Sequence, residues 1–178
     1  MAYINAEIES IENAIRTGEK TIEQGQAEFA QLISQAETMI REDEEDIKVT
    51  EEGIKSFNSA IETKEKELES LSNAISDLRW EEIGAHRDDA KSAESLAQSA
   101  VAAFEKQRDE IKAQLQDLIK EKGHLEDIKH EEEQKLSNDQ AMLNDFQRDK
   151  AEFDRNCEQV HKPNIARLKK QKQALWEK

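Results

Sequence analysis

Apolar residues in the first part of the chain recur every seven positions. Two interleaved rows share this repeat: Ile8, Ile15, Ile22, Phe29 and Ala36, and Ile4, Ile11, Gly18, Gly25, Leu32 and Met39. Alternating steps of four and three residues are typical of the narrow seam along which helices pack in a coiled coil. The pattern predicts a long helix that buries one stripe against another helix.

The seam changes phase after Phe29. Its later rows are Ile33, Ile40, Ile47, Ile54, Ile61, Leu68 and Ile75, accompanied by Phe57, Lys64, Leu71 and Leu78. The step from Phe29 to Ile33 inserts four residues into the heptad repeat. This indicates a stutter, a place where the supercoil locally unwinds.

A turn is predicted near 80–89, where the stretch WEEIGAHRDD breaks both rows. Gly84 weakens a helix there, and Asp88 and Asp89 suit the start of the next one. The later rows are Ala97, Phe104, Ile111, Leu118 and Leu125; Val101, Arg108, Leu115 and Lys122; Leu136, Leu143, Lys150 and Cys157; and Phe146, Phe153 and Val160. We expect a single all-α domain over residues 1–178, an elongated antiparallel coiled-coil bundle of a few long helices.

Two polar stretches interrupt the seam, at 41–50 and at 129–139. In the second, Lys129, Glu132 and Asp139 occupy seam positions, where polar side chains cost stability. Either stretch is a candidate break or second turn. The sequence therefore leaves open one very long hairpin and a four-helix bundle.

Glycine and proline add local expectations. Gly18 and Gly25 occupy seam positions, and they mark either a flexible helix start, which we favour, or a close approach of another backbone. Pro163 is expected to end or kink the helix near His161, because it lacks an N–H group and clashes with the preceding turn. Residues 163–178 then form a short basic helix with Pro in its first turn.

Composition argues against disorder and narrows the partners. Charged residues make up 38% of the 178 residues and hydrophobic residues 35%, but one Pro and five Gly leave good helix formers almost uninterrupted. The net charge of −15 disfavours nucleic acid and anionic membranes as partners. The sequence contains no run of 18 apolar residues, so we expect no insertion into a membrane. The start, MAYINAEIESIENAI, lacks the features of a signal peptide.

Catalytic motifs are missing from the sequence, so we expect neither an enzyme nor a bound cofactor. It contains no HExxH, CxxC, GxSxG or glycine-rich phosphate loop. Cys157 and His161 share a helix face, but Cys157 lies on the seam. A buried core cysteine is therefore favoured over a metal or thiolate site.

Clustered carboxylates are the strongest ligand candidates, because calcium accepts oxygen ligands in flexible geometry. The weak calcium candidates are Asp43, Glu44, Asp46, Glu131, Glu132 and Glu133. A solvated helix face is the favoured alternative for any single cluster. The interface candidates are Trp80, Trp176, Lys169, Lys170 and Lys172, two aromatic anchors and three residues of the basic C-terminal segment.

The stretch QRDKAEFDRNCEQVHKPNIARL, residues 147–168, is similar to the C-terminal parts of the trichocyst matrix or granule lattice proteins of ciliates, notably at Phe153, His161 and Ile165. The whole chain resembles those proteins in its acidic, heptad-rich style. The resemblance implies a helical-bundle subunit of a secretory-granule crystal that expands when calcium arrives.

The leading hypothesis is a structural protein whose partners are itself or homologous helical subunits. In a head-to-tail contact, the basic tail of one copy would meet an acidic stretch such as 42–52 of the next, and such a contact propagates into a filament or lattice. The alternative is a cytoplasmic coiled-coil adaptor or tether that binds one partner helix.

Overall fold

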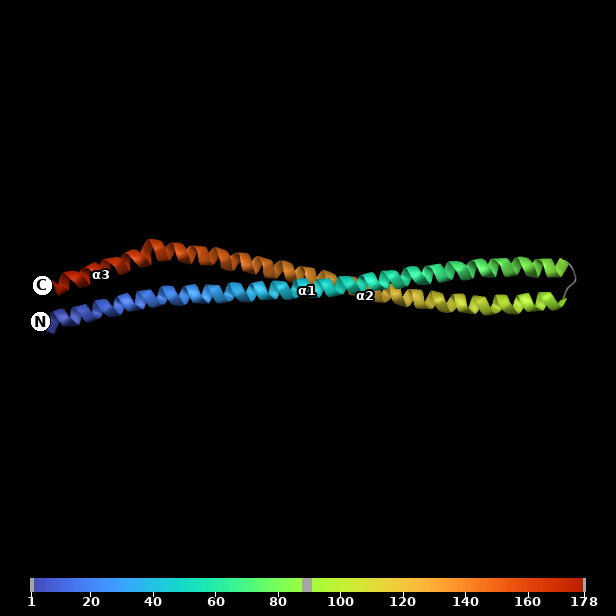
Figure 1. Cartoon of the computed structure of the whole chain (residues 1–178), viewed down its shortest axis with the longest axis horizontal. Helices are drawn as coiled ribbons and strands as arrows, with labels where there is room; N and C mark the ends of the chain where they lie inside the picture. Colours follow the sequence, from blue (N-terminus) through green and yellow to red (C-terminus); the bar gives the residue numbers. More distant parts are fainter. Residues whose placement is uncertain (1, 88–90, 178) are drawn as a thin grey trace. The chain divides into compact units, whose positions relative to one another are not determined.

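The described part of the protein, residues 2–87 and 91–177, is helical almost throughout. The computed structural model contains α1 (Ala2–Arg87), α2 (Lys91–Asn156), a π-helical turn η1 (Cys157–His161) and α3 (Lys162–Trp176). The two long helices pack against each other, and the described residues contain no strand (Figure 1). The predicted all-α helical bundle is confirmed.

Both long helices continue through the two polar stretches. α1 spans 41–50 and α2 spans 129–139 without interruption, so the predicted breaks and the four-helix alternative are wrong. Neither stretch contains the helix-breaking combination of Gly and Pro, and their polar seam residues find partners on the facing helix. Lys129, for example, forms an ion pair with Glu51 at 2.8 Å.

The predicted turn begins too early. α1 remains helical from Trp80 to Arg87, because a single exposed Gly84 costs a helix only about 1 kcal/mol relative to Ala. The other turn candidates, Asp88 and Asp89, lie outside the described residues.

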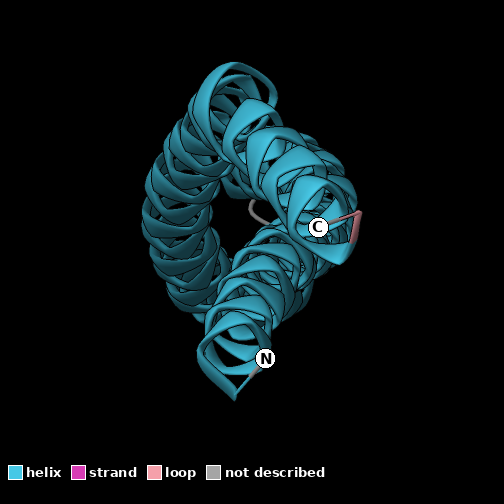
Figure 2. Cartoon of the chain, turned by 90° about the vertical axis from the view of Figure 1, so that its left-hand side faces the viewer, coloured by secondary structure: helices cyan, strands magenta, loops and turns pink. Residues whose placement is uncertain are grey.

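The helices divide into two compact units. Unit 1 comprises residues 1–44 and 134–178, and unit 2 comprises residues 45–133. In each unit a part of α1 lies antiparallel to the returning chain (Figure 1). In unit 1 the beginning of α1 lies beside the end of α3, as the end view in Figure 2 also shows. The unit boundaries fall inside the two polar stretches.

Burial along α1 follows the heptad repeat. Every seventh residue is buried or half-buried: Ile8, Ile15, Ile22, Phe29, Ala36, Asp43, Thr50, Phe57, Lys64, Leu71 and Leu78. The companion row changes at Phe29, because Ile33 and Ile40 are half-buried whereas Leu32 and Met39 remain 38% exposed. The Ile8 row continues in sevens, so the four-residue insertion predicted between Phe29 and Ile33 is wrong. Only the companion row moves, by one residue.

The ring of Phe153 packs directly against Gly25. A Cβ atom on Gly25 would lie 2.2 Å from Cζ of Phe153, and one on Gly18 would lie 3.2 Å from Cδ1 of Ile165. The ring of Phe153 also packs on Phe29, with ring centroids 5.6 Å apart. Both glycines lie inside α1, and the atoms nearest to each belong to side chains of the returning chain, not to its backbone.

The π-helical turn moves the seam by one residue. The N–H of Lys162 donates to the carbonyl oxygen of Cys157, five residues back, just before Pro163. Proline cannot donate and crowds the preceding turn, and a wider turn relieves that crowding. Val160 is consequently 49% exposed and His161 half-buried, so the prediction that Val160 lies on the seam is wrong.

Cys157 is the most deeply buried large side chain of this region, at 1% exposure. The prediction of a buried core cysteine is confirmed. The short final helix that follows, with Pro163 in its first turn, is confirmed as well.

Candidate functional site

Much of the apolar seam stays near solvent. The accessible surface of the chain is 13011 Å². A compact folded monomer of 20.5 kDa exposes about 8,900 Å². Most seam residues are half-buried, because one facing helix covers only one side of each stripe. The seam therefore keeps an apolar flank that the facing helix does not cover.

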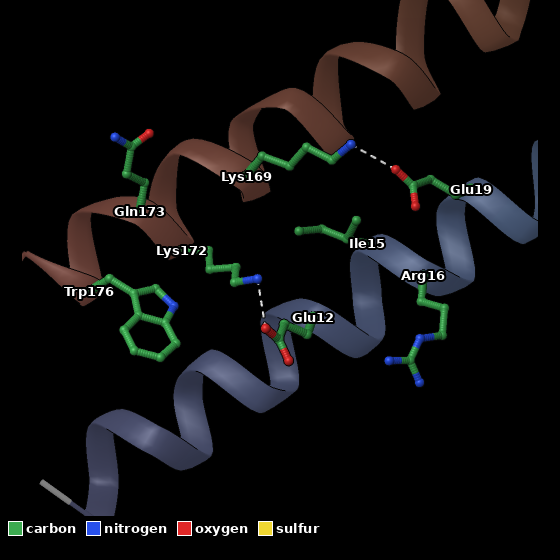
Figure 3. A pocket seen from close by; sticks show the side chains of 8 residues that line it. All are labelled: Glu12, Ile15, Arg16, Glu19, Lys169, Lys172, Gln173 and Trp176. Carbon is green, nitrogen blue, oxygen red and sulfur yellow. Dashed lines mark hydrogen bonds and ion pairs between the residues drawn. The ribbon is translucent and has the colours of Figure 1, made fainter.

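A groove between α1 and α3 lies at one end of unit 1 (Figure 3). We call it the end groove; its volume is about 740 Å³. Two ion pairs cross it, from Lys172 Nζ to Glu12 Oε1 at 2.6 Å and from Lys169 Nζ to Glu19 Oε1 at 2.7 Å. The end groove thus joins the basic C-terminal helix to the beginning of α1.

Charge and an aromatic ring shape this groove. The hydrogen bond from Lys172 and its positive charge lower the pKa of Glu12. Figure 3 shows the Trp176 ring directed toward α1 and the Arg16 guanidinium directed away from α3. Trp176 is 69% exposed. The groove is open to solvent. Ion pairs exposed to this degree contribute little to stability.

The structure separates the predicted interface residues. Lys169 and Lys172 already pair with acidic residues of their own chain, and Lys170 is exposed. Trp80 belongs to unit 2, is 71% exposed, and lines a second groove with Ile83. Sequence analysis found both exposed tryptophans, but it assigned the lysines to contacts between copies.

The calcium candidates are not gathered into one site. Glu44, Asp46, Glu131 and Glu133 are exposed. Glu132 is half-buried, and its carboxylate accepts a hydrogen bond from a hydroxyl group of the facing helix at 2.9 Å. Within residues 2–87 and 91–177, no three or more His, Cys, Asp or Glu side chains form a group that could hold a metal ion.

Asp43 differs from the other candidates, because the seam of unit 1 buries it. It is 2% exposed, and Asp139 of α2, at 8%, is buried beside it. Lys135 Nζ donates a hydrogen bond to Asp43 Oδ1 at 2.5 Å. The structure therefore makes Asp43 a member of a buried acidic pair.

Sequence reasoning placed Asp139 on the seam but missed its pairing with Asp43 and Lys135. One signal was present. Asp43 continues, seven residues after Ala36, the row that begins at Ile8. The antiparallel register, which no repeat within one helix specifies, decides which residue of α2 it meets.

Comparisons of this chain with protein-family models, curated proteins and solved structures find no match. No helix in the described ranges combines the length and apolar character needed to cross a membrane. The half-buried seam, the end groove and the opposite charges of α3 and the rest of the chain are the features that bear on function.

Proposed function

We propose that the protein is a non-catalytic structural subunit that associates through coiled-coil contacts with further copies or with homologous helical chains. The observation that carries this proposal is the half-buried seam. A single facing helix covers only one side of such a stripe. When another helix covers the remaining flank, the free energy falls by about 25 cal/mol per Å² of apolar surface buried.

Exposed apolar residues beside the seam support this proposal. In unit 1, Leu32 and Met39 stand one heptad apart on the same flank of α1. In unit 2, Trp80 and Ile83 lie one helical turn apart. Side chains at such spacing meet the ridges of a docking helix at successive turns.

Charge supports association into a filament or lattice. The chain carries −15 overall, whereas α3 contains five basic residues and no acidic one. Unlike surfaces of this kind favour heterologous contacts, which propagate instead of closing. The end groove limits the contribution of the tail, because Lys169 and Lys172 would exchange internal partners for external ones.

The resemblance to granule lattice proteins extends the proposal to a secretory-granule matrix that responds to calcium. Exposed carboxylates such as Glu44, Asp46 and Glu131 are where weak calcium binding between copies would act. Sedimentation with calcium and with a chelator tests this part separately.

Sedimentation velocity from micromolar to millimolar protein tests the central proposal. We expect the mass to rise above that of one chain, and the double variant Leu32→Gln/Met39→Gln to weaken this association at least about tenfold, because burying two apolar side chains is worth more than 1.4 kcal/mol. Leu96→Gln, at an exposed apolar position away from the seam, is the matched control.

A mass of one chain at every concentration would refute the proposal. A small oligomer that stops growing would favour the adaptor instead. Circular dichroism of each variant confirms that the helices remain folded.

A further inference from the structure

The buried acidic pair of unit 1 holds two carboxyl groups where the seam offers little solvation. Asp43 comes from α1 and Asp139 from α2, and they are 2% and 8% exposed. Within unit 1, the neighbouring seam positions Ala36, Ile40 and Leu143 are apolar and are buried or half-buried. Two carboxylates in such surroundings repel each other and are poorly hydrated.

One cation faces this pair. Lys135 donates to Oδ1 of Asp43, and its own side chain is 60% exposed. The charged groups that act on Asp139 are Asp43 from the facing helix and Lys135 from its own helix. One ammonium group therefore stands against two carboxyl groups.

Hydrogen bonding leaves the same imbalance. Oδ2 of Asp43 and Oδ2 of Asp139 are both buried, and neither has a hydrogen-bond donor among the described residues. A carboxylate only accepts, so two carboxylates in contact cannot satisfy each other. A proton on one of them turns that group into a donor and removes one of the two negative charges.

Burial raises the pKa of Asp139. Contact with Asp43 raises it further, and the charge of Lys135 opposes both effects. This direction agrees with the hydrogen-bonding argument, which is independent of it.

We propose that Asp139 holds a proton in its contact with Asp43, and that losing this proton as the pH rises loosens the packing of unit 1. The acidic pair then acts as a proton site within the seam. The proposal does not depend on self-association, because both carboxyl groups belong to one chain.

The sign of the effect follows from linkage. Asp139 holds its proton to a higher pH in the folded chain than in the unfolded chain, so the folded state binds more protons. Its stabilisation is complete below the pKa of an unfolded aspartate and is lost as the pH rises through the raised pKa. Unit 1 should therefore open more readily as the pH rises from the pKa of an unfolded aspartate through the raised pKa.

Cys157 supplies the measurement, because it is the only cysteine of the chain and is buried in unit 1. Its reaction rate with a thiol reagent, divided by the rate of the denatured chain at the same pH, reports how often unit 1 opens. This division removes the pH dependence of the thiol itself. A chelator in every buffer keeps metal ions out of the measurement.

We expect the normalised rate of the unmodified protein to rise with pH, by at most about tenfold per pH unit, the limit for one proton. Asp139→Asn should hold the rate low and nearly constant, since its amide can donate to Asp43 as the protonated acid does. Asp145→Asn, an exposed acid of α2 in the same unit, should keep the full pH dependence.

The proposal fails if Asp139→Asn keeps the same pH dependence as the unmodified protein, or if the normalised rate rises as the pH falls. Titration of the unmodified protein by carboxyl-carbon NMR covers the case in which the variant does not fold. Asp139 must then titrate at a higher pH in the folded chain than in the urea-denatured chain, and equal titration in the two states would also refute the proposal.

Discussion

Units 1 and 2 share one heptad repeat, but they fill it differently. Unit 1 packs a large side chain against a glycine, Phe153 on Gly25, and buries Cys157 under the π-helical turn. Unit 2 places long basic residues at seam positions, among them Lys64 and Lys129, whose side chains are about 30% exposed. Their methylene groups cover the seam while the ammonium groups reach solvent.

The polar residues of the two seams differ in the same way. In unit 2, the ammonium group of Lys129 reaches Glu51 at 2.8 Å, and Arg79 reaches Glu105 at 2.6 Å. In unit 1, Asp43 and Asp139 are buried, and Lys135 pairs with Asp43. The buried acids of unit 1 therefore outnumber the cation that pairs with them, whereas these two ion pairs of unit 2 are balanced one to one.

Gly25→Ala should produce the largest loss of stability. The new methyl group would overlap the end of the Phe153 ring, and a loss of about 2–3 kcal/mol is expected for overpacking a tight contact. Thermal and urea unfolding followed by circular dichroism measure it.

Gly123→Ala in unit 2 is the matched control. A Cβ atom there meets nothing within 4 Å, so the variant should gain about 0.5–1 kcal/mol from helix propensity. Equal effects at the two glycines would show that the close packing of unit 1 is not what distinguishes it.

Replacing both acids of unit 1 should stabilise the chain. The double variant Asp43→Leu/Asp139→Leu exchanges two buried polar groups for apolar ones, and a gain of about 1–2 kcal/mol at neutral pH is expected from comparable exchanges. Urea unfolding at neutral pH provides the measurement.

The single variant Asp43→Leu serves as the comparison, because it leaves Asp139 buried beside an apolar residue. It should gain less than the double variant. A double variant that is less stable than the unmodified chain would mean that the acidic pair contributes favourably as it stands.

The smallest expected effect concerns Glu51 of unit 2, whose contribution to folding stability depends on pH with the opposite sign to that of Asp139 in unit 1. The hydrogen bond and charge of Lys129 lower the pKa of Glu51. The folded chain therefore binds fewer protons at Glu51 than the unfolded chain does. The stabilisation from Glu51 is present above the pKa of an unfolded glutamate and is lost as the pH falls through the lowered pKa.

Lys129→Met should therefore flatten the acid side of the pH–stability curve while changing stability at neutral pH only slightly, since the methionine keeps the apolar cover. Thermal unfolding between acid and neutral pH measures both. An unchanged acid limb would show that this ion pair does not contribute to the pH dependence.

Heptad spacing was sufficient to predict the helices and the burial of Cys157, but not the uninterrupted row from Ile8 to Leu78. It failed at Val160. Heptad counting assumes a regular α-helix, whereas the π-helical turn over Cys157–His161 moves the buried face by one residue. It also failed at Trp80–Arg87, where local turn chemistry was weaker than the tendency of a long helix to continue.

The candidate sites were less accessible to sequence reasoning than the helices. Asp43 was found as one of several acids, and Lys172 as one of several lysines. Their partners, Asp139 and Glu12, depend on how one helix is shifted along the other. That shift is set by contacts such as Phe153 on Gly25, which periodicity within one helix does not contain.

The π-helical turn has a consequence for how this chain tolerates changes in length. In an α-helix, losing one residue rotates everything beyond it by about 100° and turns the apolar stripe away from its partner. At Cys157–His161 the chain already accommodates a surplus residue. A one-residue shortening is therefore least harmful there, and natural variation in chain length should concentrate at this turn.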